Sequence, residues 1–337
     1  MRAWQIRKFG PVEEVLELVD VPPPSPGDGE VLVEVRAVSL NPFDYKMING
    51  APEIKTLANL NLPLIPGIDF SGVIAKVSSS AGKFKAGDEV FVKMPETGGA
   101  FAEVVAAKTA WLAPKPKTLT HEEAASFPLV ALTSWQSLVD VAHLSKGQKV
   151  FIPAGSGGIG TFAIQLAKSL GAEVATTTST ANIEMVKSLG ADVVIDYKSQ
   201  DFRQVLSGYD VVYDTLGGKT LEQSLYVLKR GGIVVTINGV PDDEFVRARG
   251  MKWYFKPILY IMGRKVRNLS RELGLRYKFV LAQSNGAELS EISSLIDQGK
   301  IKPVIDRIVP FEQIPQAFTY LKQGRAKGKV VASLRKE

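Results

Sequence analysis

The strongest constraint on the fold is a glycine-rich turn within the stretch 150–180. The turn follows an apolar strand-like run at 149–154 and opens a helix-like run at 158–171. In such a setting one glycine makes the tight turn, a second lets the backbone approach a pyrophosphate, and a third lets the helix lie close to the strand. The free N–H groups of the helix N-terminus then face the phosphates. The turn therefore predicts a dinucleotide site, formed by Gly155, Ser156, Gly157, Gly158, Ile159 and Gly160.

The segments after this turn alternate between short apolar runs and helical patterns. Strand-like runs at 173–178, 192–196, 209–217 and 233–239 are separated by helix-like runs, the last of which is expected over 220–232. Strands that alternate with helices of about a dozen residues indicate βαβ units and a buried parallel sheet. The pattern predicts a doubly wound, Rossmann-type α/β domain.

The flanking segments have a different pattern. The first third contains alternating runs at 30–40, 70–80 and 88–94, separated by Gly/Pro-rich turns, which suggest a small barrel or sandwich. Helical spacing begins near 119, where Thr120 and Glu123 fit a capping box. The last third contains helices expected at 288–300 and 312–328 and strands at 302–311 and 329–334. We expect a nucleotide domain at 125–279 inserted into a discontinuous β-rich domain formed by 1–124 and 280–337.

Length and composition agree with a globular protein of two domains. The chain has 337 residues, of which 45% are apolar and 23% are charged. No apolar run reaches the roughly 18 to 20 residues of a membrane span. The first residues lack the apolar core of a secretory signal. We therefore expect an intracellular, cytoplasmic protein.

Cysteine and histidine usage excludes several kinds of site. The sequence has no cysteine, which excludes disulfides, thiolate nucleophiles and cysteine-ligated zinc. His121 and His143 occur in neither HxxxH nor HxH spacing, and we expect both to lie on helix surfaces. A serine hydrolase is also not indicated, because no GxSxG motif is present.

The end of the second strand indicates which dinucleotide is bound. A fold that binds NAD usually has an acidic residue there, on the ribose 2′-hydroxyl. The stretch 175–182, ATTTSTAN, contains hydroxyls and an amide but no acid. A carboxylate would repel a 2′-phosphate, whereas these groups can donate to it, so NADPH is favoured. No Arg or Lys stands in this loop to strengthen the preference.

Eight sequence pieces together resemble one known family. They are LNPFDYK, PGIDFSGVI, FKAGDEVF, AASFPLVALTSWQSL, AGSGGIGTFAIQLAKSLGA, SLGADVVIDY, YDVVYDTLGG and GRAKGKVV, spread over nearly the whole chain. In this combination the chain resembles the medium-chain dehydrogenase/reductase superfamily, in its zinc-free branch of quinone oxidoreductases and enone (alkenal) reductases. The resemblance implies that the discontinuous β-rich domain is GroES-like and catalytic.

The resemblance also implies roles for individual residues. Zinc-dependent members have a Cys–His pair at the positions of Asn41 and Ile68, so zinc is not expected here. Asn41, Asp44 and Lys46 match residues that line the active site near the nicotinamide. Asn182 stands where the family usually has a lysine for the 2′-phosphate. The other positions that match cofactor contacts are Thr133, Ser179, Tyr197, Leu216, Ile237, Phe279 and Val280.

The implied chemistry is hydride transfer to a conjugated enone, enal or quinone. Addition at the β-carbon leaves an enolate, whose charge needs a preorganised donor. Lys46 is a candidate to face that oxygen or to hold the nicotinamide ribose, Tyr45 to donate a proton or a hydrogen bond, and Asp44 to orient Lys46 or a water. The plain alternatives are that Asn41 and Asp44 are turn residues and that Tyr45 packs at a domain interface. Asp69 is interpreted as structural, and the donor of the α-carbon proton is not identified.

One segment carries most of the basic character. The range 245–280 contains ten Lys/Arg and one acid, although the net charge of the whole chain is only +6. Three interpretations of 245–278 stay open: a wall of the substrate pocket that includes Trp253, a peripheral membrane helix, and a solvated basic helix at a subunit contact.

Other functions remain compatible with the sequence. The leading interpretation is an NADPH-dependent reductase of enones, enals or quinones. The alternatives are a non-catalytic NADPH-binding redox sensor, a nucleic-acid-binding protein, although no nucleic-acid partner is expected, and a one-electron quinone reductase. Dimers are frequent among proteins of this kind, which favours a homodimer without fixing the oligomeric state.

Overall fold

The computed structural model describes residues 1–58, 60–78, 82–249 and 255–334. The chain forms two compact units. Met1–Leu132 together with Gln283–Glu337 is called the β-rich domain below, and Thr133–Ala282 is called the α/β domain. Each is described by itself.

The β-rich domain is built on a seven-stranded sheet with the strand order β14-β15-β3-β4-β5-β7, in which β6 also pairs with β3. The long strand β3 organises the sheet, because it pairs antiparallel with β15, β4 and β6. A separate two-stranded sheet joins β1 and β2. The strands are β1 (Arg2–Gln5), β2 (Glu17–Asp20), β3 (Glu30–Leu40), β4 (Asp69–Val77), β5 (Glu89–Lys93), β6 (Val104–Lys108), β7 (Leu112–Pro114), β14 (Ile305–Pro310) and β15 (Lys329–Ser333).

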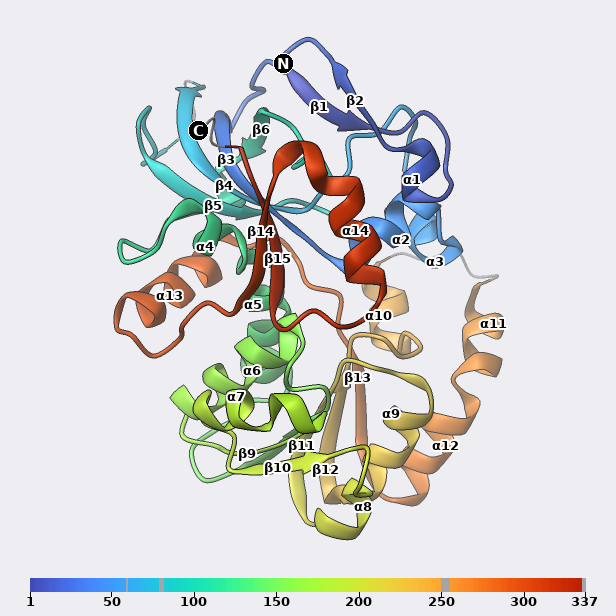
Figure 1. Cartoon of the computed structure of the whole chain (residues 1–337). Coiled ribbons are helices and arrows are strands. Elements are labelled where there is room, and N and C mark those ends of the chain that lie inside the picture. Colours follow the sequence, from blue (N-terminus) through green and yellow to red (C-terminus); the bar gives the residue numbers. More distant parts are fainter. Residues whose placement is uncertain (59, 79–81, 250–254, 335–337) are drawn as a thin grey trace. The chain divides into compact units, whose positions relative to one another are not determined.

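Helices surround this sheet in the same domain (Figure 1). The expected capping box is confirmed at α4, where Thr120 Oγ1 accepts a hydrogen bond from Glu123 N and the Glu123 carboxylate accepts one from Thr120 N. The helices are α1 (Val12–Val15), α2 (Pro42–Asn49), α3 (Pro52–Ala58), α4 (His121–Ala125), α13 (Gly286–Asp297) and α14 (Ile314–Lys322), and α5 (Pro128–Trp135) leads into the α/β domain.

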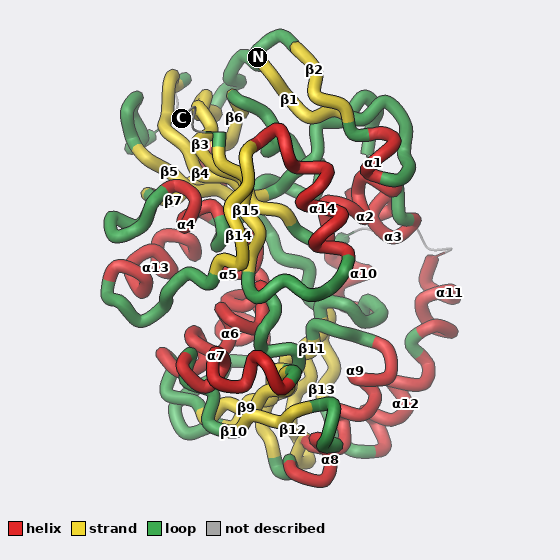
Figure 2. Tube along the Cα trace, in the orientation of Figure 1, coloured by secondary structure: helices red, strands yellow, loops and turns green. Residues whose placement is uncertain are grey.

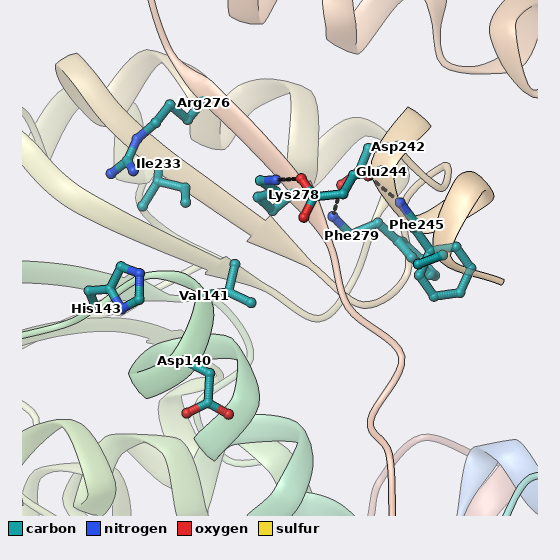
Figure 3. A pocket seen from close by; sticks show the side chains of 11 residues that line it. Asp140, Val141, His143, Ile233, Asp242, Glu244, Phe245, Arg276, Lys278 and Phe279 are labelled. Carbon is teal, nitrogen blue, oxygen red and sulfur yellow. Dashed lines mark hydrogen bonds and ion pairs between the residues drawn. The ribbon is translucent and has the colours of Figure 1, made fainter.

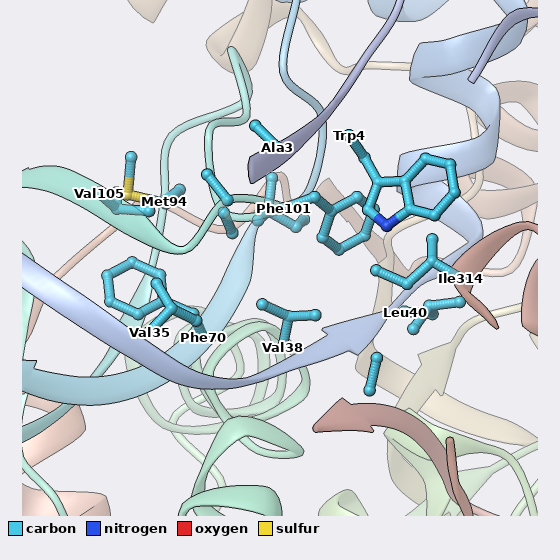
Figure 4. Close-up of a cluster of buried hydrophobic side chains, with 14 of the residues drawn as sticks. Ala3, Trp4, Val35, Val38, Leu40, Phe70, Met94, Phe101, Val105 and Ile314 are labelled. Atoms are coloured by element: carbon cyan, nitrogen blue, oxygen red, sulfur yellow. The ribbon is translucent and has the colours of Figure 1, made fainter. Parts of the chain in front are cut away.

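The core of the β-rich domain forms where the sheet meets these helices (Figure 4). Val33 and Val35 of β3 share one face, and a register shift between Val35 and Ala37 brings Val38 and Leu40 into the same buried cluster. Trp4 packs near Phe311, and its indole N–H donates to the Phe311 carbonyl at 2.9 Å. This satisfied core fixes β3, at whose end the sequence NPFDYK begins.

The α/β domain has the expected parallel sheet, with the strand order β10-β9-β8-β11-β12-β13 (Figure 2). All neighbouring strands in it are parallel. The fold class predicted from the sequence is therefore confirmed. The strands are β8 (Lys149–Ile152), β9 (Glu173–Thr178), β10 (Val193–Asp196), β11 (Tyr209–Asp214), β12 (Leu228–Thr236) and β13 (Arg276–Phe279); the helices are α6 (Gly158–Ser169), α7 (Ile183–Ser188), α8 (Phe202–Val205), α9 (Gly218–Ser224), α10 (Asp243–Ala248), α11 (Phe255–Met262) and α12 (Arg264–Glu272).

The helix expected over 220–232 is wrong in its second half. Helix α9 ends at Ser224, a 3₁₀ turn follows, and β12 already begins at Leu228. Leu228 pairs with Tyr209 of β11, and a bulge separates this pair from the regular register that follows. Gly231, which has φ +82, lies within the strand. Sheet pairing thus overrides the helical spacing of the local sequence.

Two smaller findings complete the fold. The helix expected over 312–328 ends at Lys322, before the sequence GRAKG. Among the described residues, no helix combines the length and the apolar character needed to cross a bilayer.

Candidate functional site

A buried polar cluster lies at one end of the β-rich sheet. The register places Asp69 of β4 opposite Ser39 of β3 on one side and Lys93 of β5 on the other. On the far side of β3, Leu40 pairs with Val330, so Lys329 at the start of β15 lies next to Asn41. The cluster, defined as Asn41, Asp44, Asp69, Lys93 and Lys329, is almost fully buried.

Asp69 is the centre of the cluster. Its Oδ2 accepts from Asn41 Nδ2 at 2.9 Å and from Ser39 Oγ at 3.3 Å, and Lys329 Nζ lies 3.5 Å away. Its Oδ1 accepts from the backbone N–H of Leu129 at 2.8 Å, near the start of α5, where the helix dipole favours a negative charge. Asp69 was expected to be structural, and the geometry shows it as the common acceptor for Asn41 and Lys329.

Asn41 is held on both sides of its amide. Lys329 Nζ donates to Asn41 Oδ1, while Asn41 Nδ2 donates to Asp69. These two bonds fix the orientation of the amide, since the ammonium can only donate and the carboxylate accepts. The side chain is 1% exposed. Asn41 is also the N-cap of α2, so the cluster sets where that helix starts.

Burial perturbs the ionisable groups of the cluster. Desolvation raises the pKa of the Asp69 carboxyl, against the opposing effects of Lys329 and the hydrogen bonds from Asn41 and Leu129. Desolvation likewise lowers the pKa of Lys329, against the attraction of Asp69 and Asp44. Asp44 is the most affected, because burial and the neighbouring Asp69 raise its pKa to about 8. At neutral pH the Asp44 carboxyl is therefore mainly protonated.

Asp44 combines a structural contact with a free oxygen. Its Oδ2 accepts from the backbone N–H of Asn41 at 2.8 Å and completes the capping box of α2. Its Oδ1 is buried, with no hydrogen-bond partner among the residues that the structure describes. A protonated carboxyl with an uncommitted oxygen is a proton donor kept away from water.

The wild-type protein is expected to lose stability as the pH rises, and the substitution Asp44→Asn is expected to remove that loss. The carboxyl has an ordinary pKa of 3.8 and a folded pKa of about 8. The folded state holds the extra proton between these values, so its stability falls as the pH rises from about 4 to about 8, by at most about 1.4 kcal/mol per pH unit. Urea unfolding at pH 5, 6.5 and 8 measures the free energy of unfolding of both proteins. The value for the variant should rise relative to that of the wild type as the pH increases. A pH-independent difference would contradict the burial of an ionisable Asp44.

Tyr45 and Lys46 follow Asp44 on α2 and are half-buried. Tyr45 packs against the hydrophobic core of the β-rich domain. Helix α2 thus carries all four predicted catalytic residues, with Asn41 and Asp44 inside the cluster and Tyr45 and Lys46 partly open to solvent.

The glycine turn of the α/β domain has the geometry that its sequence predicts. A Cβ on Gly155 would lie 2.2 Å from Thr176 Oγ1, and one on Gly160 would lie 2.4 Å from the Ala154 carbonyl oxygen. Both positions are closed by the protein itself. A Cβ on Gly157 would meet only the Ala154 carbonyl oxygen, at 3.5 Å. Gly157 is the N-cap of α6, so open space lies above a helix N-terminus, and this fits a dinucleotide pyrophosphate.

The predicted ribose end lies after β9. Asn182 Nδ2 is 3.3 Å from Ser179 Oγ, and Asn182 Oδ1 is buried without a partner among the described residues. The expected contact residue Tyr197 is 60% exposed at the end of β10. Asp196, which the sequence analysis did not consider, accepts a hydrogen bond from Thr180 Oγ1. A carboxylate from the neighbouring strand therefore reaches this loop, although β9 itself ends without an acid.

The residues expected along the nicotinamide half follow the carboxyl ends of three adjacent strands. Leu216 lies after β11 and Ile237 after β12, and the buried Asp214 ties these ends together by accepting from Thr236 Oγ1 at 2.7 Å. The backbone N–H of Ile237 donates to the Asp214 carbonyl at 3.1 Å. Ligands of open α/β sheets bind at such strand ends. Val280 N donates to the Thr236 carbonyl at 2.9 Å.

Two further residues that were expected to contact the cofactor, Thr133 and Phe279, do not lie at these strand ends as open positions. Thr133 is buried within the α/β domain. Phe279 lines a cavity of about 440 Å³ beside β12 and β13 (Figure 3). In this cavity Lys278 pairs with Glu244, and Asp242 accepts from the backbone of Phe279 at 2.8 Å. Residues 155–160, all of which the structure describes, do not line it, so we do not assign it to the pyrophosphate.

The expectation for the histidines is wrong for His121. Its side chain is buried rather than on a helix surface, because Ser71 Oγ lies 2.9 Å from Nδ1 and Glu89 lies 3.3 Å from Nε2. His143 is exposed, but it lies after the π-helical turn Gln136–Val141 with a positive φ of 54°, so it is not on a helix surface either. Within the described ranges, no group of three or more His, Asp or Glu side chains is arranged to hold a metal ion.

Sequence reasoning missed four polar residues of these sites. They are Lys93 and Lys329 of the buried cluster, Asp196 beside the ribose loop and Asp214 beneath the strand ends. All four are charged residues at the first or last position of a strand. The strand-like runs of the sequence showed this for two of them, because Asp196 ends the run 192–196 and Lys329 begins the run 329–334. Lys329, for example, begins the apolar run KVVAS.

Comparison with known proteins gives the family. Residues 27–117 match the model of the alcohol dehydrogenase GroES-like domain, and residues 189–331 match that of the zinc-binding dehydrogenase. The chain is 35% identical to a 2-methylene-furan-3-one reductase of Solanum lycopersicum, over 98% of this chain and 78% of the relative. It is 33% identical to an NADPH-dependent alkenal/one oxidoreductase of Arabidopsis thaliana, over 98% and 79%.

A solved structure agrees with these matches along the whole chain. The quinone oxidoreductase from Coxiella burnetii superposes with a TM-score of 0.86 at 34% identity, over 99% of each chain. The chain therefore belongs to the medium-chain dehydrogenase/reductase superfamily, in the branch of the quinone and alkenal oxidoreductases.

Proposed function

We propose that this protein is an NADPH-dependent, zinc-independent oxidoreductase that reduces conjugated enones, enals or quinones. The observation that carries the proposal is the glycine turn, in which Gly157 alone of the three motif glycines is open, at the N-terminus of α6. The acceptor class comes from the relatives that are named alkenal/one, furanone and quinone oxidoreductases.

The α/β domain would hold the cofactor through its own groups. The backbone N–H groups at the start of α6 receive the pyrophosphate, and Ser179, Asn182 and Tyr197 receive the 2′-phosphate. When bound, the cofactor supplies a hydride for the β-carbon of the acceptor. The strand ends at Leu216 and Ile237 are proposed to flank the nicotinamide half.

The β-rich domain would supply the groups that act on the acceptor. Lys46 and Tyr45, which are half-buried on α2, are proposed to donate to the carbonyl oxygen as negative charge develops there. Asn41 is proposed to act from within the buried cluster, because Lys329 and Asp69 occupy both sides of its amide. Asp44 keeps α2 in place through the capping box.

Asn182→Lys is expected to tighten NADPH binding by about tenfold without changing NADH binding. Asn182 Nδ2 lies 3.3 Å from Ser179 Oγ. A lysine ammonium at this position would pair with the 2′-phosphate, which NADH lacks. Fluorescence titration with both cofactors measures the two dissociation constants. Asn182→Gln, which adds length without charge, is the control. Equal changes for NADPH and NADH would contradict the assignment of this loop to the 2′-phosphate.

EDTA is expected to leave turnover unchanged. The sequence has no cysteine, and Asn41 and Ile68 stand where zinc-dependent members of the superfamily have a Cys–His pair. Activity after dialysis against EDTA should equal that after dialysis against buffer, and added Zn²⁺ should not raise it. A loss that Zn²⁺ restores would overturn the zinc-independent mechanism.

Loss of absorbance at 340 nm with NADPH and a panel of enones, enals and quinones tests the proposed function. Turnover with the electron-poor acceptors, and none with saturated ketones, is expected. A tight NADPH complex that reduces no acceptor would instead identify a redox sensor or another non-catalytic binder. Detection of a semiquinone during turnover would identify a one-electron quinone reductase.

We further propose a cytoplasmic homodimer. One relative is named as mitochondrial, in Danio rerio, and another as chloroplastic, in Arabidopsis thaliana, so cell fractionation decides the compartment of this chain. Sedimentation velocity of the purified chain decides the oligomeric state.

A further inference from the structure

The two helices α11 and α12 form an unusual surface on the α/β domain. They follow one another directly, separated by Gly263, and α12 packs beside α9 (Figures 1 and 2). Of the expected basic segment 245–278, residues 250–254, including Trp253, lie outside the described residues. The surface described next is formed by residues from Ile258 onward.

Helix α12 is anchored to the domain by one face. Val266, Leu269 and Leu273 pack against the hydrophobic cluster under the sheet. Arg264 and Arg271 are seven residues apart, which is nearly two full turns of the helix, so they share the opposite face, and both are exposed. The helix therefore presents cations to solvent while its apolar side is buried.

Helix α11 has the reverse character, because its apolar side chains are exposed. Ile258, Ile261 and Met262 occupy positions i, i+3 and i+4 and thus share one face. They are 53%, 72% and 64% exposed. The hydrophobic cluster against which α12 packs includes no side chain of α11. An apolar helix face that no described part of the domain covers indicates an interaction surface.

The junction between the helices is held in a fixed arrangement. The Arg267 guanidinium lies 4.7 Å from the centre of the Tyr260 ring and donates to the Tyr260 carbonyl. Lys265 pairs with Glu222 of α9. Arg267 and Lys265 are thus engaged within the domain, whereas Arg264 and Arg271 have no ion-pair partner in the part of the chain that the structure describes.

We propose that the exposed apolar face of α11 (Ile258, Ile261 and Met262), together with Arg264 and Arg271 of α12, docks the protein on an anionic lipid bilayer. Interfacial helices combine an apolar face, which enters the boundary of the acyl chains, with basic residues, which meet anionic headgroups. Charge complementarity favours this partner over a neutral membrane. The apolar face favours it over a nucleic acid, whose binding depends mainly on cations.

Docking would bring the protein to the phase in which long-chain quinones and lipid-derived enals dissolve. That consequence rests on the proposed function. The binding itself does not, so vesicle binding without turnover, or turnover without vesicle binding, separates the two claims.

Co-sedimentation of the full chain with vesicles tests the proposal. Vesicles of phosphatidylcholine with about one third phosphatidylglycerol should bind the protein at low salt, and pure phosphatidylcholine should bind it much more weakly. Raising the salt concentration should release it, because the Debye length shortens. Binding that is absent, or equal for both vesicle types, overturns the proposal.

Two pairs of variants assign the binding to this surface. Arg264→Ser with Arg271→Ser should weaken partitioning about 25-fold, at about fivefold for each cation, and Ile261→Ser with Met262→Ser should weaken it about tenfold or more. The controls are Arg325→Ser, at another exposed arginine, and Ile308→Ser, at an isoleucine that is 53% exposed on β14. All variants should keep the melting temperature and the NADPH affinity of the wild type. Equal losses in the controls overturn the assignment.

Two other occupants of the surface would show themselves in the same samples. If the double variant Ile261→Ser/Met262→Ser changes the sedimentation coefficient of the free protein and leaves vesicle binding intact, the apolar face contacts a second copy of the chain and the proposal fails. The partner is a nucleic acid, and the proposal fails, if the wild-type protein binds RNA in a salt-sensitive way and does not bind anionic vesicles, and if the double variant Arg264→Ser/Arg271→Ser no longer binds RNA.

Discussion

Lys329→Met is expected to destabilise the protein by about 3–5 kcal/mol, the usual cost of removing one partner from a buried ion pair. Asp69 is fully buried, and Lys329 Nζ, 3.5 Å from its Oδ2, is the cation that approaches it most closely in the described network. The substitution also removes the hydrogen bond that Lys329 donates to Asn41 Oδ1, so this buried oxygen loses that donor. Urea unfolding of the full chain measures the change.

The pH and a double variant separate the charge effect from a simple packing defect. The loss should be larger at pH 8 than at pH 5, because a buried Asp69 without its cation folds more easily when it is protonated. Lys329→Met combined with Asp69→Asn should be less destabilised than Lys329→Met alone, since no uncompensated charge remains. A Lys329→Met protein within about 1 kcal/mol of the wild type would show that the buried pair does not stabilise the sheet end.

Gly157→Val is expected to weaken NADPH binding on the order of 100-fold or more while the protein stays folded. The backbone at Gly157, with φ −78 and ψ 169, is extended, so any residue can adopt it. A Cβ there would meet only the Ala154 carbonyl oxygen, at 3.5 Å, and the valine side chain would enter the space that we propose for the pyrophosphate. Titration with NADPH and a thermal melt without cofactor together measure the effect.

Gly160→Ala is the matched control for this glycine. Its Cβ would lie 2.4 Å from the Ala154 carbonyl oxygen and 2.7 Å from Gly155 Cα, so the helix must shift away from the strand. We expect a lower melting temperature, corresponding to about 1–3 kcal/mol of strain. Reversed outcomes, with Gly157→Val unfolding the protein and Gly160→Ala leaving its stability intact, would contradict the roles given to the two glycines.

Periodicity predicted most of the fold because the strands are buried in regular sheets. Strand β3 and strand β9 have the bounds that alternation and the apolar runs indicate. The error at 220–232 arose because the sequence of Leu228–Thr236 begins with polar and glycine residues, which only the pairing with β11 turns into a strand. Such long-range pairing cannot be recognised from local spacing.

The nucleotide half of the candidate site was easier to predict than the buried cluster. Gly155, Gly157 and Gly160 lie within six consecutive residues, and each has a steric reason that is visible in the motif. The cluster instead joins Asn41 to Lys329, which is 288 residues away in the sequence. Only the strand register of β15, β3, β4 and β5 brings its members together. The interpretation of Asp69 as structural was made without these neighbours, so it could not name Asn41 and Lys329 as its partners.

Transfer of deuteride from 4-deuterated NADPH to an enone tests the central claim most directly. The account predicts NADPH oxidation with the deuterium on the β-carbon of a saturated ketone and a proton from solvent on the α-carbon, and NMR of the product shows both positions. The Gly157→Val protein, run in parallel below its own dissociation constant for NADPH, should give little product. Deuterium on the carbonyl carbon of an allylic alcohol would contradict the account. So would a wild-type protein that binds NADPH, transfers no deuterium to any enone and oxidises no NADPH with any quinone.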